Sequence, residues 1–213
     1  MIITNKIPNI PYSRYDKIQN FLRKKRREIL IFLEHSSCIT AGINYKIENL
    51  LVKEDFLKEK KIDLFFLKRG GDFTAHEKGQ LVIYPHIDLK KRNLHITNFL
   101  KVFIDSIQVA IFQTWKLQTV YNEADPGLYI QENPKKKIVS IGVSFKSFFT
   151  SFGAAINIQN NLEIFSYINP CGKDSKDIVS IKSLGLDYQK ENALIKNFTE
   201  KFLQKIEERH WLS

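Results

Sequence analysis

The chain has 213 residues, of which 43% are hydrophobic and 26% are charged, and its formal net charge is +10. The apolar fraction excludes an intrinsically disordered chain, and the 9 Gly and 6 Pro residues exclude collagen-like and low-complexity architectures. The 2 Cys residues cannot form a disulfide framework, and the longest apolar runs are too short for a membrane span. We therefore expect a single domain over residues 1–213, located in the cytoplasm and without stable membrane association.

Hydrophobic periodicity predicts helices and short buried strands in mixed order along the chain. The predicted helices are 15–28, 94–115 and 191–209. The predicted strands are 29–33, 62–67, 80–87, 127–131, 137–145 and 149–158. We expect a turn through Asn133 and Pro134 to join the strands 127–131 and 137–145. Because the order lacks a strict β-α-β-α rhythm, we expect an α+β (mixed α/β) domain, with one mixed β-sheet flanked by helices.

The positive charge indicates a partner rich in negative charge: a nucleic acid, an anionic membrane surface or an acidic protein. The basic residues recur as the runs 24–27, 58–61, 90–92 and 135–137. Each run lies between apolar segments, which is typical of the solvated ends of helices and strands. Because zinc-finger spacing, a basic zipper and RNP-type aromatic motifs are absent from the sequence, we expect no nucleic-acid partner.

Cys171 is the strongest candidate nucleophile. It lies in Asn169-Pro170-Cys171-Gly172, where proline fixes one backbone angle and glycine frees the next, so a tight turn can present the thiol at its tip. Cys38 lacks such framing, and we interpret it as a small buried hydrophobe. A reactive thiolate needs a nearby cation, and the sequence alone leaves open which Lys or His supplies it.

The segment that begins at Arg69-Gly70-Gly71 is a second candidate. Paired glycines let backbone N–H groups approach a ligand and Arg can hold an anion or a carbonyl, although a Gly-Gly pair between strands is more often only a turn. His76 follows in what reads as a polar loop, where it could act as a base or a hydrogen-bond donor. The glycine spacing matches neither a Walker loop nor a dinucleotide fingerprint, and the His and Cys spacing predicts no metal site.

Three longer segments carry a family resemblance when they are taken together and in order. They are Arg69-Gly-Gly-Asp-Phe-Thr-Ala-His76 with Gly79-Gln80-Leu81-Val82 and Tyr84-Pro85, then Lys137-Ile-Val-Ser-Ile-Gly142, then Ile168-Asn-Pro-Cys-Gly172. Weaker matches are Leu33-Glu34-His35, Asp125-Pro126-Gly127-Leu128 and Gly153-Ala154-Ala155-Ile156-Asn157. These segments, which extend from about residue 15 to 180, resemble the lipoyl(octanoyl) transferases.

The resemblance implies the fold of the biotin and lipoate protein ligase catalytic core and an acyl transfer that needs neither cofactor nor ATP. It implies that Cys171 attacks the octanoyl thioester of acyl carrier protein and that a lysine of a lipoyl domain then takes the acyl group. The acceptors would be lipoyl domains of 2-oxoacid dehydrogenases and the glycine cleavage H protein. Lys137 would lower the pKa of Cys171 and move protons, and a basic rim at Lys135 and Lys136 would dock the acidic carriers.

The same resemblance implies an acyl-binding cavity. Its expected lining is Arg69, Gly70, Gly71, Asp72, Phe73, Thr74, Ala75, His76, Ser140, Ile141, Gly142, Gly153, Ala154 and Ala155. An eight-carbon chain favours an apolar slot by ~0.8 kcal/mol per buried CH₂, and a thioester oxygen favours backbone N–H donors.

The sequence departs from the family pattern at Ala75, Glu77, Lys78, Tyr129 and Phe152. Two alternatives therefore remain open: an amidotransferase whose donor is an octanoylated or lipoylated protein, and a non-catalytic basic binding module. An ATP-dependent ligase is disfavoured, because no added nucleotide-binding feature is visible in the sequence.

Overall fold

The computed structural model of the chain describes residues 1–131, 135–169 and 175–207. The helices are α1 (Tyr12–Lys25), α2 (Glu54–Glu59), α3 (Ile96–Trp115) and α4 (Glu191–Glu207). The strands are β1 (Ile2–Ile3), β2 (Ile7–Ile10), β3 (Ile29–His35), β4 (Cys38–Ala41), β5 (Asp63–Phe66), β6 (Phe73–His76), β7 (Gln80–His86), β8 (Thr119–Asn122), β9 (Gly127–Ile130), β10 (Lys136–Lys146) and β11 (Phe149–Asn157).

The strands form two sheets, where the sequence pattern predicted one. The larger sheet has 8 strands in the order β1-β3-β7-β11-β10-β9-β8, with β2 also paired to β3. It is mixed, because β1 and β2 run parallel to β3 whereas the other pairs are antiparallel. The smaller sheet has 3 strands in the order β5-β4-β6.

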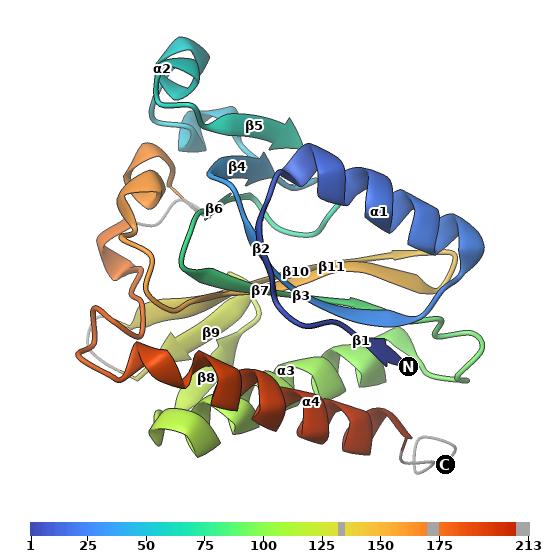
Figure 1. Ribbon diagram of the computed structural model, residues 1–213. Helices are drawn as coiled ribbons and strands as arrows, with labels where there is room; N and C mark the ends of the chain where they lie inside the picture. The colour runs from blue at the N-terminus through green and yellow to red at the C-terminus, as the bar shows by residue number, and fades with distance from the viewer. Residues whose placement is uncertain (132–134, 170–174, 208–213) are drawn as a thin grey trace.

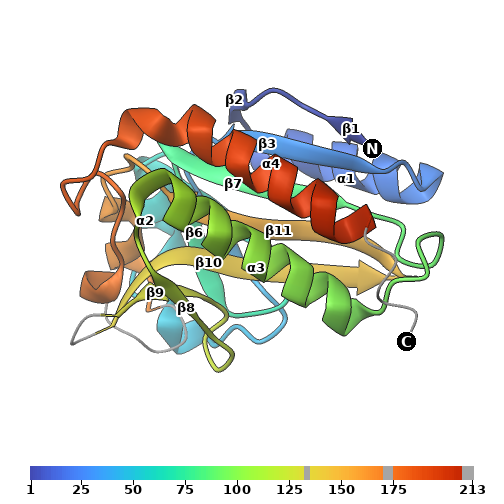
Figure 2. The same cartoon turned by 90° about the horizontal axis from the view of Figure 1, so that it is seen from below.

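Helices cover the two faces of the larger sheet differently. Helices α3 and α4 pack side by side against one face, and α1 and the smaller sheet lie on the other (Figure 1). Seen from below, α3 and α4 cross over the strands of the larger sheet (Figure 2). Phe103, Ile107 and Ile111 of α3 and Phe198 and Phe202 of α4 are all fully buried in the core between these helices and the sheet.

Most predicted elements are confirmed, with shifts at their ends. The first helix begins at Tyr12, three residues before the predicted start, because Pro11 occupies its N-cap and Tyr12 is buried beside Tyr15. The pattern missed the strands β1, β2, β4, β6 and β8, because short strands give too few alternations to recognise. The predicted turn at Asn133 and Pro134 and the helix end at Arg209 lie outside the described residues.

No helix within the described ranges is both long enough and apolar enough to cross a membrane.

Candidate active site

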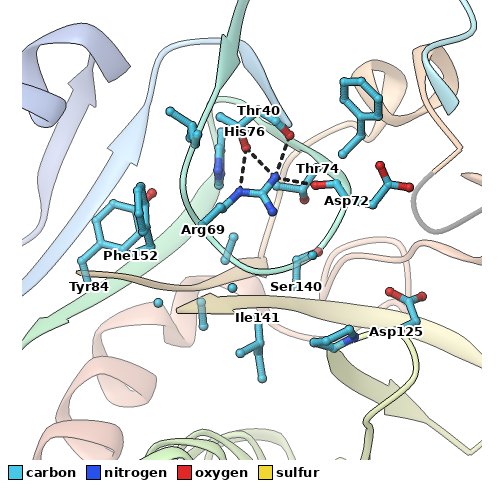
Figure 3. Close-up of a pocket in the computed structure, with 18 of the residues that line it drawn as sticks. Thr40, Arg69, Asp72, Thr74, His76, Tyr84, Asp125, Ser140, Ile141 and Phe152 are labelled. Carbon is cyan, nitrogen blue, oxygen red and sulfur yellow. Dashed lines mark hydrogen bonds between the residues drawn. The ribbon is translucent and has the colours of Figure 1, made fainter. Parts of the chain in front are cut away.

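A cavity lies between the two sheets. The smaller sheet and the loop that joins β5 to β6 form one side of it, and the middle strands of the larger sheet form the other. The cavity has about 550 Å³ of empty space, a figure that includes its open mouth. Its lining is Tyr12, Thr40, Leu67, Arg69, Gly71, Asp72, Phe73, Thr74, His76, Tyr84, Asp125, Pro126, Lys137, Ser140, Ile141, Gly142, Phe152, Gly153, Ala154 and Ala155. Figure 3 shows Asp125 on one side of this cavity and Tyr84 and Phe152 on the opposite side.

Lys137, the predicted partner of the nucleophile, lines this cavity and forms a buried ion pair there. Its Nζ donates to Asp125 Oδ1 at 2.6 Å, and the two side chains are 9% and 5% exposed. Tyr129, which lies opposite Lys137 in the β9–β10 ladder, donates its hydroxyl to the second oxygen of the same carboxylate. The Lys137 amine also lies 5.6 Å from the centre of the Tyr129 ring. The run of lysines at 135–137, which the sequence pattern predicted to be solvated, therefore ends in a buried residue.

Gly127 leaves the space through which the Lys137 side chain passes. A Cβ atom at this position would lie 2.4 Å from Lys137 Cε and 2.4 Å from the carbonyl oxygen of Val139. Because neither contact is sterically tolerable, a larger residue would displace the lysine. The Asp125-Pro126-Gly127 segment thus provides both the carboxylate and the room that fix the amine.

Arg69 lines the cavity, but its guanidinium is engaged by the protein's own groups. It donates to the hydroxyl and carbonyl of Thr40 and to the carbonyls of Gly70 and Asp72. Arg69 does hold carbonyls, as its chemistry suggested, but they belong to the loop that it shapes. Asp72 is similarly engaged, by the Asn49 side chain and the backbone N–H of Lys46. These bonds set the shape of the loop between β5 and β6.

His76 does not lie in a polar loop, so that prediction was wrong. It ends strand β6, which pairs with β4, and it is 5% exposed. Burial, and secondarily the nearby His35, lower its pKa from the usual 6.5 to about 3. Its Nδ1 donates to Gln80 Oε1 at 2.8 Å, since the Gln80 amide nitrogen faces other acceptors. His76 therefore faces the cavity as a neutral imidazole.

The predicted cavity residues come together with two exceptions. Ala75 is fully buried in the core beneath the smaller sheet, because it alternates with Thr74 and His76 along β6. Gly70 is not part of the cavity lining, although its carbonyl accepts from Arg69. The others predicted from the motifs around Arg69, Lys137 and Gly153 line the same space. Cys171 lies outside the described residues.

Residues that the motifs did not single out for this role also line the cavity. They are Tyr12, Thr40, Leu67, Tyr84, Asp125, Pro126 and Phe152. Asp125 and Pro126 were within a weakly matching segment, and Phe152 was noted only as a departure. Tyr84 was within a matching segment but was not assigned to the cavity. Tyr12 and Thr40 gave no sequence signal, because a buried aromatic or Thr in a strand or helix usually belongs to a core.

Two residues of the cavity lining, Tyr12 and Thr74, carry a buried hydroxyl that has no hydrogen-bond partner among the described residues. A buried hydroxyl without a partner costs free energy, so it favours a ligand that carries an acceptor. The described part of the chain contains no cluster of His, Cys, Asp and Glu that could hold a metal ion.

Residues 14–207 match the model of the lipoyl protein ligase A/B catalytic domain. The octanoyltransferase of Leptospira interrogans is 53% identical over 179 residues, which are 84% of this chain and 83% of that protein. The octanoyltransferase of Caldicellulosiruptor bescii is 33% identical over 165 residues, or 76% of this chain and 71% of that protein.

Solved structures share the fold at low identity. A bipartite lipoate protein ligase of Thermoplasma acidophilum superposes with a TM-score of 0.71 at 17% identity, covering 95% of this chain and 85% of that one. The biotin protein ligase of Aquifex aeolicus gives a TM-score of 0.55 at 12% identity, covering 96% and 69%. The expected biotin and lipoate ligase fold is thereby confirmed. With the family model and the curated relatives, this shows that the chain belongs to the lipoyl protein ligase A/B catalytic domain family and, within it, to the octanoyltransferases.

Proposed function

We propose that this chain, as one domain over residues 1–213 in the cytoplasm, moves an octanoyl group from octanoyl-acyl carrier protein to Cys171 and then to a lysine of a lipoyl domain. The acceptors would be lipoyl domains of 2-oxoacid dehydrogenases and the glycine cleavage H protein. The observation that carries this proposal is the buried Lys137 amine, fixed by Asp125 at one end of a cavity whose opposite end is aromatic.

The residues that flank Cys171 support its meeting with Lys137. The backbone N–H of Asn169, two residues before the cysteine, donates to the carbonyl of Asn49, whose side chain binds the cavity residue Asp72. On the other side, the backbone N–H of Val179 donates to the carbonyl of Lys137 at 2.9 Å. Both flanks are therefore hydrogen-bonded to the cavity wall or to its immediate support.

Cys38 does not compete for the role. It is 1% exposed in a strand, and burial raises its pKa far above the usual value, so it stays a neutral thiol. The interpretation of Cys38 as a structural residue is confirmed.

The chemistry balances with these two groups. The Lys137 ammonium stabilises the Cys171 thiolate, whose proton is lost to solvent, and this thiolate forms a bond to the thioester carbonyl carbon. The bond from that carbon to the carrier sulfur breaks, and Lys137 gives a proton to the departing thiolate, which leaves Lys137 as a neutral amine. In the second half, the acceptor lysine forms a C–N bond, the Cys171 thiolate leaves, and the neutral Lys137 amine receives the proton released by the acceptor. Because a thioester is exchanged for an amide, no ATP is consumed.

The rest of the cavity suits an acyl chain. Ile141, Ala154, Phe152 and Tyr84 contribute apolar groups to its lining, and each methylene buried there contributes ~0.8 kcal/mol. The net charge of +10 complements acidic carrier proteins.

The direct test is intact-protein mass spectrometry after incubation with octanoyl-acyl carrier protein. We expect one octanoyl adduct on the wild-type protein and on Cys38→Ala, and none on Cys171→Ala. Peptide mapping should place the adduct on Cys171, and adding a lipoyl domain should discharge it. An adduct of equal yield on Cys171→Ala would disprove the mechanism. Replacing the donor by an octanoylated protein in the same assay distinguishes an amidotransferase.

A further inference from the structure

The cavity is separated from a larger groove by a wall of three side chains. Tyr12, Leu67 and Phe152 line both spaces. The groove beyond them runs along α1 and β5, and it also exposes Phe65 and Phe66. A bound chain that passed this wall would therefore find open, partly apolar space.

The wall lies at the end of the cavity farthest from the reacting groups. Phe152 pairs with Val143 in the β10–β11 ladder, and Lys137 is the second residue of the same strand β10, six residues before Val143. The Lys137 side chain runs beside Gly127, which pairs with Ser140, so its amine lies about three residues, or roughly 10 Å, along the strand from Val143. Ser140, Ile141 and Gly142 of the cavity lining lie between Lys137 and Val143 in this strand. Figure 3 likewise shows Phe152 across the cavity from Asp125, the partner of Lys137.

The backbone at Phe152 is unusual and aims its side chain at this position. Its φ is 62°, in the left-handed region that a bulky residue rarely adopts. The residue after it, Gly153, has no room for a Cβ, because the atom would lie 2.1 Å from the carbonyl oxygen of Ile83. Strained backbone that persists in a fold is a reason to look for a function of the side chain it positions.

We propose that Phe152, supported by Tyr12 and Leu67, closes the far end of the acyl cavity and limits the length of the fatty acyl chain that this protein accepts. The proposal rests on the acyl-binding role of the cavity proposed above. An octanoyl chain with its carbonyl at Lys137 directs its methyl end toward Phe152. A longer chain would have to displace the phenyl ring, whereas removal of the ring would let its extra carbons enter the groove beside Phe65.

Phe152 is the member of the wall to change. Tyr12 is held by ring contacts with Tyr15, His35 and Phe65, so its loss would disturb the core. Phe152→Ala shortens the side chain, and Phe152→Gly does so with a residue that accepts the positive φ. Phe148→Ala is the matched control, because Phe148 is the same residue type in the same hairpin, also has a positive φ (57°), and is 55% exposed outside the cavity.

The experiment measures binding of octanoic, decanoic and dodecanoic acids by calorimetry, together with transfer from the corresponding acyl carrier protein thioesters. Each added methylene that becomes buried should improve affinity about fourfold. We therefore expect decanoic acid to gain about 15-fold relative to octanoic acid in Phe152→Ala and Phe152→Gly, and dodecanoic acid to gain more. Phe148→Ala should keep the wild-type preference.

Two results would overturn the proposal: a chain-length preference within twofold of wild type in both Phe152 variants, or a wild-type protein that already binds dodecanoic acid as tightly as octanoic acid. Thermal unfolding shows whether each Phe152 variant folds. If one of them does not fold, the chain-length preference of the other tests the proposal. The Cys171 adduct on wild-type protein reports separately on the proposed chemistry. A failure of that chemistry is thus distinguishable from a failure of the length limit.

Discussion

Asp125 and Lys137 form an ion pair of 2.6 Å that is almost wholly removed from solvent. The carboxylate comes from the turn between β8 and β9, and the amine comes from the start of β10. The two groups can meet because Gly127, which has no side chain, leaves room for the lysine. The pair has a consequence for stability as well as for chemistry, because breaking a buried pair leaves an uncompensated charge.

Replacing Asp125 by Asn should lower the free energy of unfolding by about 3 kcal/mol and slow octanoyl transfer by about 10²-fold, because the amine loses the charge that holds it in place. Urea denaturation and transfer kinetics measure the two effects. Adding Lys137→Met to Asp125→Asn should cost less stability than the sum of the single changes, by at least about 1 kcal/mol. Strict additivity would show that the two side chains do not stabilise each other.

Tyr129→Phe should lower the free energy of unfolding by about 2 kcal/mol, since a buried carboxylate oxygen loses a hydroxyl donor. Urea denaturation measures this effect. Tyr121→Phe is the control, because Tyr121 is 40% exposed on the neighbouring strand β8. Equal stability of wild type and Tyr129→Phe would mean that the hydroxyl contributes nothing to the site.

Buried histidines should make the protein lose stability as the pH falls below about 6.5. Burial lowers the pKa of His76 to about 3 and those of His35 and His86 to about 4, whereas the unfolded chain titrates near 6.5. Below about 6.5 the unfolded state binds more protons, so each group removes up to about 1.4 kcal/mol per pH unit until its folded pKa is reached.

Denaturation at several pH values between 6.5 and 5 measures how steeply the free energy of unfolding changes with pH. This interval lies above the range in which carboxylates dominate the pH dependence of stability. His86→Gln should reduce this slope by the contribution of about one proton, because burial lowers the pKa of His86 in the folded state. A wild-type stability that is flat across this interval would contradict the neutral state of the buried imidazoles.

Charge reversal of Lys135 and Lys136 to Glu should raise KM for octanoyl-acyl carrier protein several-fold at low salt, with the difference shrinking as ionic strength increases. Lys135 is exposed and Lys136 is partly exposed beside Lys137, at the start of β10. Lys24→Glu with Lys25→Glu changes the net charge equally at the exposed end of α1 and should have a smaller effect. Equal effects of the two pairs would indicate a general charge effect and no docking at this rim.

The long elements were predictable because their residues bury one face with a regular period. Phe103, Ile107 and Ile111 already specify the core-facing side of α3, a continuous apolar run predicts β3, and a partly alternating segment predicts β7. The smaller sheet was not predictable as a sheet, although its strand β5 was predicted as 62–67, because β4 and β6 are only four residues long and pair with segments distant in the chain.

By itself the sequence determined the family and most of the residues that line the cavity, because motifs such as Lys137 to Gly142 are contiguous and do not depend on packing. Only the tertiary structure decided which side chains meet. It paired Lys137 with Asp125, placed His76 on a buried strand as a neutral group, directed Ala75 into the core and set Phe152 as the end wall. These outcomes depend on strand register and on desolvation, which arise when segments far apart in the chain pack together.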